Sequence, residues 1–150
     1  MACPFFYPTG QLDQTLWSHP RRLPLGGGFA GICRARAGED FRPLEFSQLD
    51  CCNLGYAAAS GCSRFPLDGA PEAVRFAVAR DQNSLVLIQY VVEKGHLPHE
   101  HGTLEFDRDC GRFRAAPDNA VLARQAQVYV ELYLRRRYDA GTQDRPGVAV

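Results

Sequence analysis

Alternating apolar and polar positions predict a β-sheet in the second half of the chain. Residues 73–80 alternate in the manner of a half-buried strand, with valines and a phenylalanine on one side. Residues 85–92 are apolar on both sides apart from Gln89, which is typical of a central strand. A polar loop over residues 93–100 then leads to a third strand near residues 103–106. Because the connections are short, the three strands are expected to form an antiparallel meander.

The apolar period lengthens to that of a helix after Pro117. Pro117 and Asp118 are expected to begin a long helix, and three arginines at residues 135–137 to end it, since cations complement the negative end of the helix dipole. One stripe of this helix is wide enough to cover a sheet face. It comprises Leu122, Ala126, Tyr129 and Tyr133. Residues 141–150 are predicted to be a disordered tail.

Proline and glycine punctuate residues 1–46 and leave no room there for a long regular element. Ser47 then has the properties of a helix N-cap, with an acidic residue, Asp50, three positions later. Gly61 is a natural end for this second helix.

These elements predict an α+β fold in a single domain over residues 1–140. A loop-rich, cysteine-bearing region is expected over residues 1–66. Residues 67–140 are expected to form a small antiparallel sheet of about three strands with the C-terminal helix packed on it.

Composition and charge exclude several classes of protein. Hydrophobic residues make up 45% and charged residues 23% of the chain, as in ordinary globular proteins. Lysine plus arginine and aspartate plus glutamate number 17 each, and no basic stripe interleaves with aromatic residues, so a nucleic-acid partner is not expected. No apolar run approaches the ~20 residues that a membrane helix needs, so a membrane partner is not expected either.

The N-terminal sequence MACPFFYPTG bears on the redox compartment. It lacks the basic and apolar regions of a signal peptide, so a cytoplasmic location is expected. Thiols stay reduced in the cytoplasm, where clustered cysteines bind metals or serve in catalysis more often than they form disulfides. Three disulfides, the alternative that six cysteines allow, would suit a secreted protein.

Five of the six cysteines fall in the first 62 residues, and they predict a metal centre. Their spacing contains no CxxC pair, the usual knuckle of structural zinc sites. An iron–sulfur cubane is larger than a single ion, accepts thiolates from separate loops and is held by four cysteines. The prediction is a [4Fe–4S] cluster, with zinc as the alternative. Its ligands would be Cys3, Cys33, Cys62 and one of the adjacent pair Cys51 and Cys52.

This prediction requires a break in the second helix. Cys51 and Cys62 would lie about 16 Å apart along one straight helix, at ~1.5 Å per residue, which is too far for one cluster. The chain is therefore expected to turn at Gly55 or Gly61. Cys52 lies on the apolar face of this helix, so burial as an inert thiol is the alternative for it.

Several motifs together resemble those of a known group of proteins. They are CPFF near the start, LPLGGGFAGIC, CCNLGYAAASGCSRFP and, later, HGTLEFD. The combination is similar to that of a group of small uncharacterised bacterial proteins associated with iron–sulfur binding, and the similarity covers about residues 3–107. It implies no known activity. Electron transfer, redox sensing and a structural role stay open, as does the identity of a redox partner protein.

Two other features are expected to lie outside this centre. Residues 26–31 match GxGxxG, but neither a strand before them nor a helix after them is expected, so a nucleotide site is not predicted. These glycines are expected instead to let the backbone bend close to Cys33. The sixth cysteine, Cys110, is expected to be a buried apolar thiol.

The histidine-rich segment at residues 96–101, HLPHEH, carries a competing hypothesis. It lacks the HExxH pattern of zinc peptidases. His99 and His101 would face the same side if the segment enters a strand. With His96 or Glu100 they would then form a mixed histidine–carboxylate metal site. A metal-dependent or cysteine-dependent enzyme is therefore the second hypothesis, and a cofactor-free interaction domain is the third.

Overall fold

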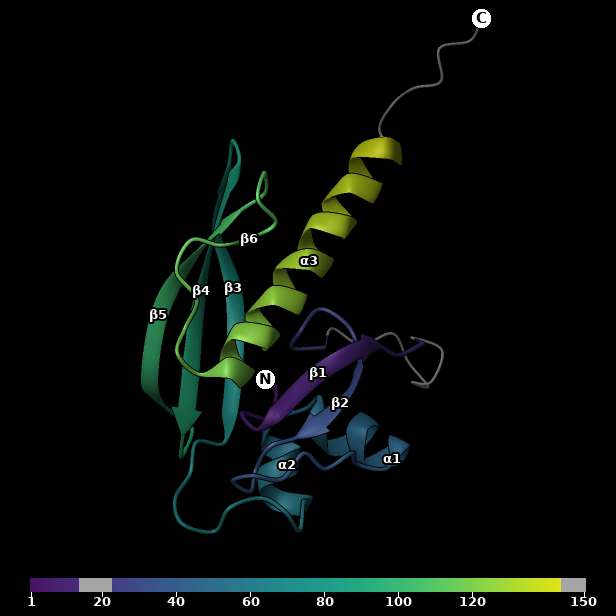
Figure 1. Cartoon of the computed structure of the whole chain (residues 1–150), viewed down its shortest axis with the longest axis vertical. Helices are drawn as coiled ribbons and strands as arrows, with labels where there is room; N and C mark the ends of the chain where they lie inside the picture. Colours follow the sequence, from purple (N-terminus) through teal and green to yellow (C-terminus); the bar gives the residue numbers. More distant parts are fainter. Residues whose placement is uncertain (14–22, 144–150) are drawn as a thin grey trace, which may run out of the picture.

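The computed structural model describes residues 1–13 and 23–143, which form two antiparallel sheets, one long helix and several short helical segments (Figure 1). The strands are β1 (Phe6–Gln11), β2 (Phe29–Cys33), β3 (Ala73–Gln82), β4 (Leu85–Lys94), β5 (Leu97–Asp107) and β6 (Arg112–Phe113). The helical segments are α1 (Glu45–Ser47), the π-helical turn η2 (Gln48–Cys52), α2 (Tyr56–Gly61) and α3 (Ala120–Gln143). The predicted α+β class, with antiparallel strands and a C-terminal helix, is confirmed.

β3, β4, β5 and β6 form one antiparallel sheet in that order, so the predicted meander is correct but the predicted number of strands is too low. β6 adds a fourth strand of two residues, which pairs with the end of β5. β5 begins at Leu97, because Gly95 and His96 make a two-residue turn with φ of 58° and 60°. Such a turn matches the twist of the flanking strands. Of the segment that was expected to be a loop, residues 93–94 end β4, residues 95–96 make the turn and residues 97–100 begin β5.

α3 packs on a face of this sheet, as its apolar stripe predicted (Figure 1). The buried residues at this contact are Val86, Ile88, Leu104, Phe106, Ala126 and Val130. The helix begins later than predicted, because the Oδ1 of Asn119 accepts hydrogen bonds from the N–H groups of Val121 and Leu122 at 3.0 and 3.1 Å. It runs past the arginines at residues 135–137, where it was expected to end, to Gln143; residues 144–150 of the predicted tail lie outside the described chain. None of the described helices is long and apolar enough to cross a membrane.

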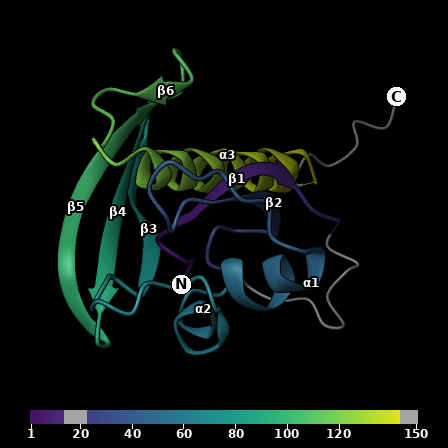
Figure 2. The same ribbon diagram turned by 60° about the horizontal axis from the view of Figure 1, so that its bottom comes forward.

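The N-terminal region is more regular than predicted, because β1 and β2 form a second, two-stranded sheet. Pro8 and Gly10 stand on either side of an irregularity in the pairing. Gly31 of β2 allows close approach, since a Cβ there would lie 2.2 Å from the Tyr7 carbonyl oxygen. The two strands lie between α3 and the short helices (Figure 2). Residues 14–22 of the predicted loop region lie outside the described residues.

The helix predicted from Ser47 to Gly61 is broken into pieces, as the prediction of a shared cysteine site requires. Ser47 ends α1 instead of capping a helix, and η2 follows it directly. The chain then turns at Gly55, whose φ of 58° favours glycine, before α2 begins. A Cβ at Gly55 would lie 2.2 Å from the Met1 carbonyl oxygen, so glycine lets the N-terminal segment cross here. Of the two predicted positions for the break, Gly55 and Gly61, the chain uses Gly55, and Gly61 ends α2.

Candidate metal centre

Five of the six cysteines meet where the N-terminal segment, β2, η2 and α2 pack together. Cys3 precedes β1, Cys33 ends β2, Cys51 and Cys52 lie in η2, and Cys62 follows α2. Cys3 and Cys52 are buried members of one hydrophobic core cluster, and Cys51 and Cys62 pack against it. All of them are free thiols. Segments far apart in the sequence therefore supply the thiols of one site.

Two adjoining cavities distinguish Cys51 from Cys52. The inner cavity, of about 20 Å³, is lined by Cys3, Cys33, Cys52 and Cys62 among apolar neighbours. The outer cavity, of about 220 Å³, is lined by Cys51 together with Cys33, Cys52 and Cys62. Cys52 faces both cavities, whereas Cys51 faces the outer one. Cys52 is therefore the member of the adjacent pair that lies with Cys3.

A buried glutamine of α3 fixes the segment that carries Cys3. The Gln125 side chain is fully buried, and its Nε2 donates to the carbonyl oxygens of Cys3 and Phe6 at 2.8 and 2.7 Å. Ala2 pairs with β3 in an isolated bridge, which ties the same segment to the large sheet. The Cys3 N–H donates to the Cys52 carbonyl oxygen at 3.2 Å. Cys3 is thus held by α3, by the sheet and by η2.

Two further buried amides hold η2 against β2. Asn53 is 1% exposed. Its Nδ2 donates to the carbonyl oxygens of Phe29 and Gln48 at 3.0 and 2.7 Å, and its Oδ1 accepts from the Phe29 N–H at 2.9 Å. The Oε1 of Gln48 accepts in turn from the Gly31 N–H at 3.1 Å. Because buried polar groups are costly to leave unpaired, these bonds set the position of η2 relative to the strand that ends in Cys33.

Arg64 contacts Cys33 and the segment that follows β2. Its Nη2 donates to Oε2 of Glu39 at 2.9 Å, and its guanidinium carbon lies 4.1 Å from the centroid of the Phe41 ring. Phe41 pairs with Cys33 through backbone hydrogen bonds of 2.6 and 3.2 Å. The Arg64 side chain is 17% exposed and lines both cavities. Hydrogen bonding to Glu39 and then to Cys33 raises the pKa of Arg64, so a fixed positive charge stands beside the thiols.

Burial keeps the inner thiols protonated. It raises the pKa of Cys3 to about 12, and the neighbouring Cys33 and Cys62 add to the effect. Burial likewise raises the pKa of Cys52, with contributions from the other four thiols of the site. A desolvated thiolate is costly unless an opposite charge compensates it. The site therefore needs a cation to hold these sulfurs in the thiolate form.

The residues present fit a thiolate-bound metal or cluster in two respects. Four cysteines are the usual ligands of iron–sulfur clusters and of closed zinc sites. The Nε of Arg64 is buried without a hydrogen-bond partner, and a sulfur that carries negative charge would be an acceptor for it. Across residues 1–13 and 23–143, no three His, Cys, Asp or Glu side chains are already arranged to hold a metal ion. The thiols would therefore have to turn toward a common centre on binding.

The histidines of the competing hypothesis lie on the β4–β5 hairpin and line neither cysteine cavity. His96 stacks on Tyr56, with ring centroids 4.1 Å apart. His99 and His101 are exposed on β5. The Tyr56 hydroxyl donates to the buried Glu93 at 2.5 Å and so ties α2 to the hairpin. The contacts of His96 and Glu93 with Tyr56 therefore join this hairpin to α2.

Neither the sixth cysteine nor the glycine-rich segment takes part in the centre. Cys110 is exposed in the turn between β5 and β6, which corrects the prediction that it is buried. Residues 26–31 lead into β2 and no helix follows them, so they lack the strand–turn–helix context of a dinucleotide site.

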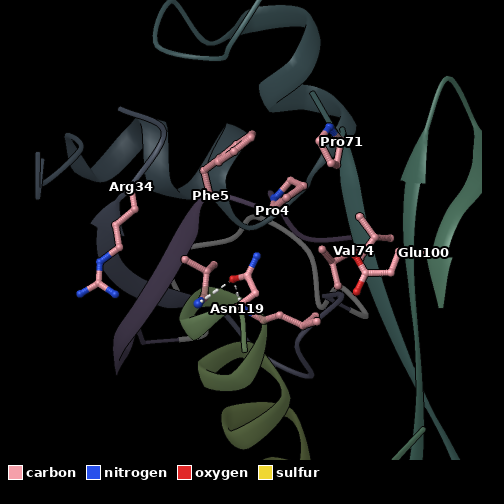
Figure 3. A pocket seen from close by; sticks show the side chains of 10 residues that line it. Pro4, Phe5, Arg34, Pro71, Val74, Glu100 and Asn119 are labelled. Carbon is pink, nitrogen blue, oxygen red and sulfur yellow. Dashed lines mark hydrogen bonds between the residues drawn. The ribbon is translucent and has the colours of Figure 1, made fainter. Parts of the chain in front are cut away.

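A larger cavity, of about 340 Å³, lies between the N-terminal segment, the large sheet and the beginning of α3 (Figure 3). Its wall is mostly apolar, and none of its described lining residues is a cysteine or histidine. Arg34 points away from the cavity, and its Nε contacts Asp40 at 3.2 Å. Glu100 accepts a hydrogen bond from the Tyr90 hydroxyl at 3.4 Å. Arg34 and Glu100, the charged residues that line this cavity, thus have partners within the protein, and the cavity supplies no ligand to the cysteine centre.

Four side chains that position the centre were not identified from the sequence. They are Gln48, Asn53, Arg64 and Gln125. The signal for Asn53 and Arg64 was their place beside cysteines, within CCNLGYAAASGCSRFP. Gln125 shares a helix face with Val121, Val128 and Leu132, and a polar residue on a buried face usually has a hydrogen-bond partner. Gln48 carried no such signal.

Neither a scan against protein-family models nor searches of curated proteins and of solved structures found a match. The five thiols and the side chains that surround them are therefore the observations that bear on function.

Proposed function

We propose that the protein holds an iron–sulfur cluster, of the [4Fe–4S] type, on the thiolates of Cys3, Cys33, Cys52 and Cys62. The observation that carries the proposal is the gathering of thiols from separate chain segments in one largely buried place. Protonated thiols gain from one another only the packing of small apolar groups. A metal centre, in contrast, ties such segments together, because its binding free energy is also folding free energy. The resemblance of the cysteine motifs to those of small uncharacterised bacterial proteins associated with iron–sulfur binding supports the same proposal.

Cys52 is chosen as the fourth ligand over Cys51. It lines the inner cavity with Cys3, and all four other thiols of the site contribute to its raised pKa. The pKa of Cys51 is raised by burial and then by Cys62 and Asp50, with no contribution from Cys3. Cys51 is therefore proposed to remain a free thiol at the edge of the centre.

The position of the centre favours a redox role over a purely structural one. A bound cluster of this type supplies one-electron transfer. Phe6 is buried and Phe5 half-buried at the inner cavity, and both exclude water from that side. Cys51 and Cys62 are only half-buried, so the opposite side lies close to the surface, where electrons can be exchanged. We propose electron transfer or redox sensing in the cytoplasm, with a protein redox partner.

The proposal is tested by purification without oxygen, followed by measurement of iron, acid-labile sulfide and zinc. The wild type should be brown, and dithionite should bleach its visible absorbance. Serine replacement of Cys52 or Cys62 should remove iron and colour, because each change deletes a ligand. Cys51→Ser and Cys110→Ser are the matched controls and should retain both.

Other outcomes point to the alternatives. A colourless wild type with stoichiometric zinc would replace the cluster by a structural zinc site. Loss of iron in Cys51→Ser but not in Cys52→Ser would reverse the ligand assignment. A metal lost on replacement of His99 and His101, but kept in every cysteine variant, would favour the enzyme hypothesis. A wild type that takes up no metal would refute the proposal.

A further inference from the structure

We propose that Arg64 is a positioning residue of this centre, which raises its reduction potential by presenting Nε–H and a positive charge to the sulfur of Cys33. The inference rests on the proposed cluster. It adds a residue that is not a ligand, and it assigns separate roles to the parts of the guanidinium group.

Two contacts hold the Arg64 side chain. Its Nη2 is anchored on Glu39 at 2.9 Å, and its guanidinium face lies on the Phe41 ring at 4.1 Å. Phe41 is joined to Cys33 by two backbone hydrogen bonds. Arg64 is therefore linked to the Cys33 backbone through Phe41, and its contacts with Glu39 and Phe41 restrict the orientation of its planar group.

Nε–H is the donor of the Arg64 guanidinium group that these contacts leave unused. Nε of Arg64 is buried and has no hydrogen-bond partner among the described residues. A buried N–H of a charged group is costly to leave unpaired. The Arg64 side chain lines both cavities that Cys33 lines, so this N–H lies in the same part of the site as the Cys33 thiol. A thiolate at Cys33 would supply the missing acceptor.

Arg64 should favour the reduced form of the cluster over the oxidised form. Reduction of the cluster adds one electron, supplied in the assay by dithionite, and no bond forms or breaks. Negative charge on the sulfurs increases, so a nearby cation and an N–H donor stabilise the reduced form more than the oxidised form. Hydrogen bonds to sulfur and local charge are the means by which proteins tune such potentials. Removal of Arg64 should therefore lower the potential.

The experiment compares reduction potentials in four variants of the full chain. Arg64→Gln should shift the ratio of reduced to oxidised protein about tenfold toward the oxidised form, which is about 59 mV for a one-electron couple. Arg64→Lys keeps the charge but lacks the planar donor, so its potential should lie between those of Arg64→Gln and wild type. Arg80→Gln, at an exposed position of β3, controls for the change in net charge and should leave the potential unchanged.

Glu39→Gln separates an effect of Arg64 on the reduction potential from a simple loosening of the segment that contains Cys33 and Phe41. It breaks the same ion pair but removes a negative charge, so it should not lower the potential. Amide hydrogen exchange at Cys33 and Phe41, measured in metal-free protein, should become faster in both Arg64→Gln and Glu39→Gln, because both release the segment. Equal downward shifts in these two variants would reduce Arg64 to a structural contact and overturn the inference.

The failure of this inference is distinct from that of the proposed function. If the wild type holds iron but Arg64→Gln has the potential of Arg80→Gln, Arg64 does not tune the centre, and the cluster proposal stands. If the wild type holds no iron, the proposed function fails and the inference fails with it.

Discussion

Replacement of Asn53 by alanine should destabilise the metal-free protein by about 3 kcal/mol, since it removes three buried hydrogen bonds worth ~1 kcal/mol each. Two of these bonds reach Phe29 at the beginning of β2, and the third reaches Gln48 in η2. The side chain is 1% exposed, so water does not replace the lost partners without rearrangement.

The loss is measured by urea unfolding of the metal-free protein, followed by circular dichroism. With a denaturant slope of ~2 kcal/mol per M for a chain of this size, the midpoint should fall by about 1.5 M. Gln89→Ala removes an exposed amide from β4 and is the control, with an expected change within ~0.5 kcal/mol. A loss below about 1 kcal/mol in Asn53→Ala would refute the reasoning that this side chain holds η2 against β2.

Three other changes test the account. In metal-free protein, burial raises the pKa of Cys3 from 9 to about 12, so the stability that protonated Cys3 contributes is complete below pH 9 and is lost as the pH rises toward 12. The wild type should therefore lose more stability than Cys3→Ser over this range. Parallel pH profiles of stability for the two proteins would contradict the assignment. Gly55→Ala should cost more than ~2 kcal/mol by thermal unfolding, because the new Cβ meets the Met1 carbonyl oxygen at a positive φ, and a smaller loss would contradict that contact. Replacing His99 and His101 together with alanine should change stability by less than ~0.5 kcal/mol and leave bound iron unchanged.

The sequence predicted the large sheet and α3 well, because their apolar patterns have distinct periods. β1 and β2 were missed because Pro8, Gly10 and Gly31 read as breakers, whereas Gly31 serves to bring the strands together. β1 and β2 pair although they are not neighbours in the sequence, and the local pattern of apolar and polar residues does not predict such pairing. The start of β5 was missed because its first five residues are all exposed and include Pro98 and two histidines, so they lack the apolar alternation of a half-buried strand.

The candidate centre was predictable in its residue types and in part of its geometry. The requirement that Cys51 and Cys62 approach one another predicted a break at Gly55 or Gly61, and the chain turns at Gly55. The choice between Cys51 and Cys52 depends on tertiary packing, which sequence spacing does not encode. The same holds for Gln125, which reaches the Cys3 carbonyl oxygen across 122 positions of the chain.

X-ray absorption at the iron edge tests the central claim most directly, on wild type and on Cys51→Ser purified without oxygen. The account predicts a first shell of sulfur alone with iron–iron scattering behind it, and identical spectra for the two proteins, because Cys51 is not a ligand. Nitrogen or oxygen donors in the first shell, a spectrum that changes in Cys51→Ser, or the absence of iron from wild type would contradict it.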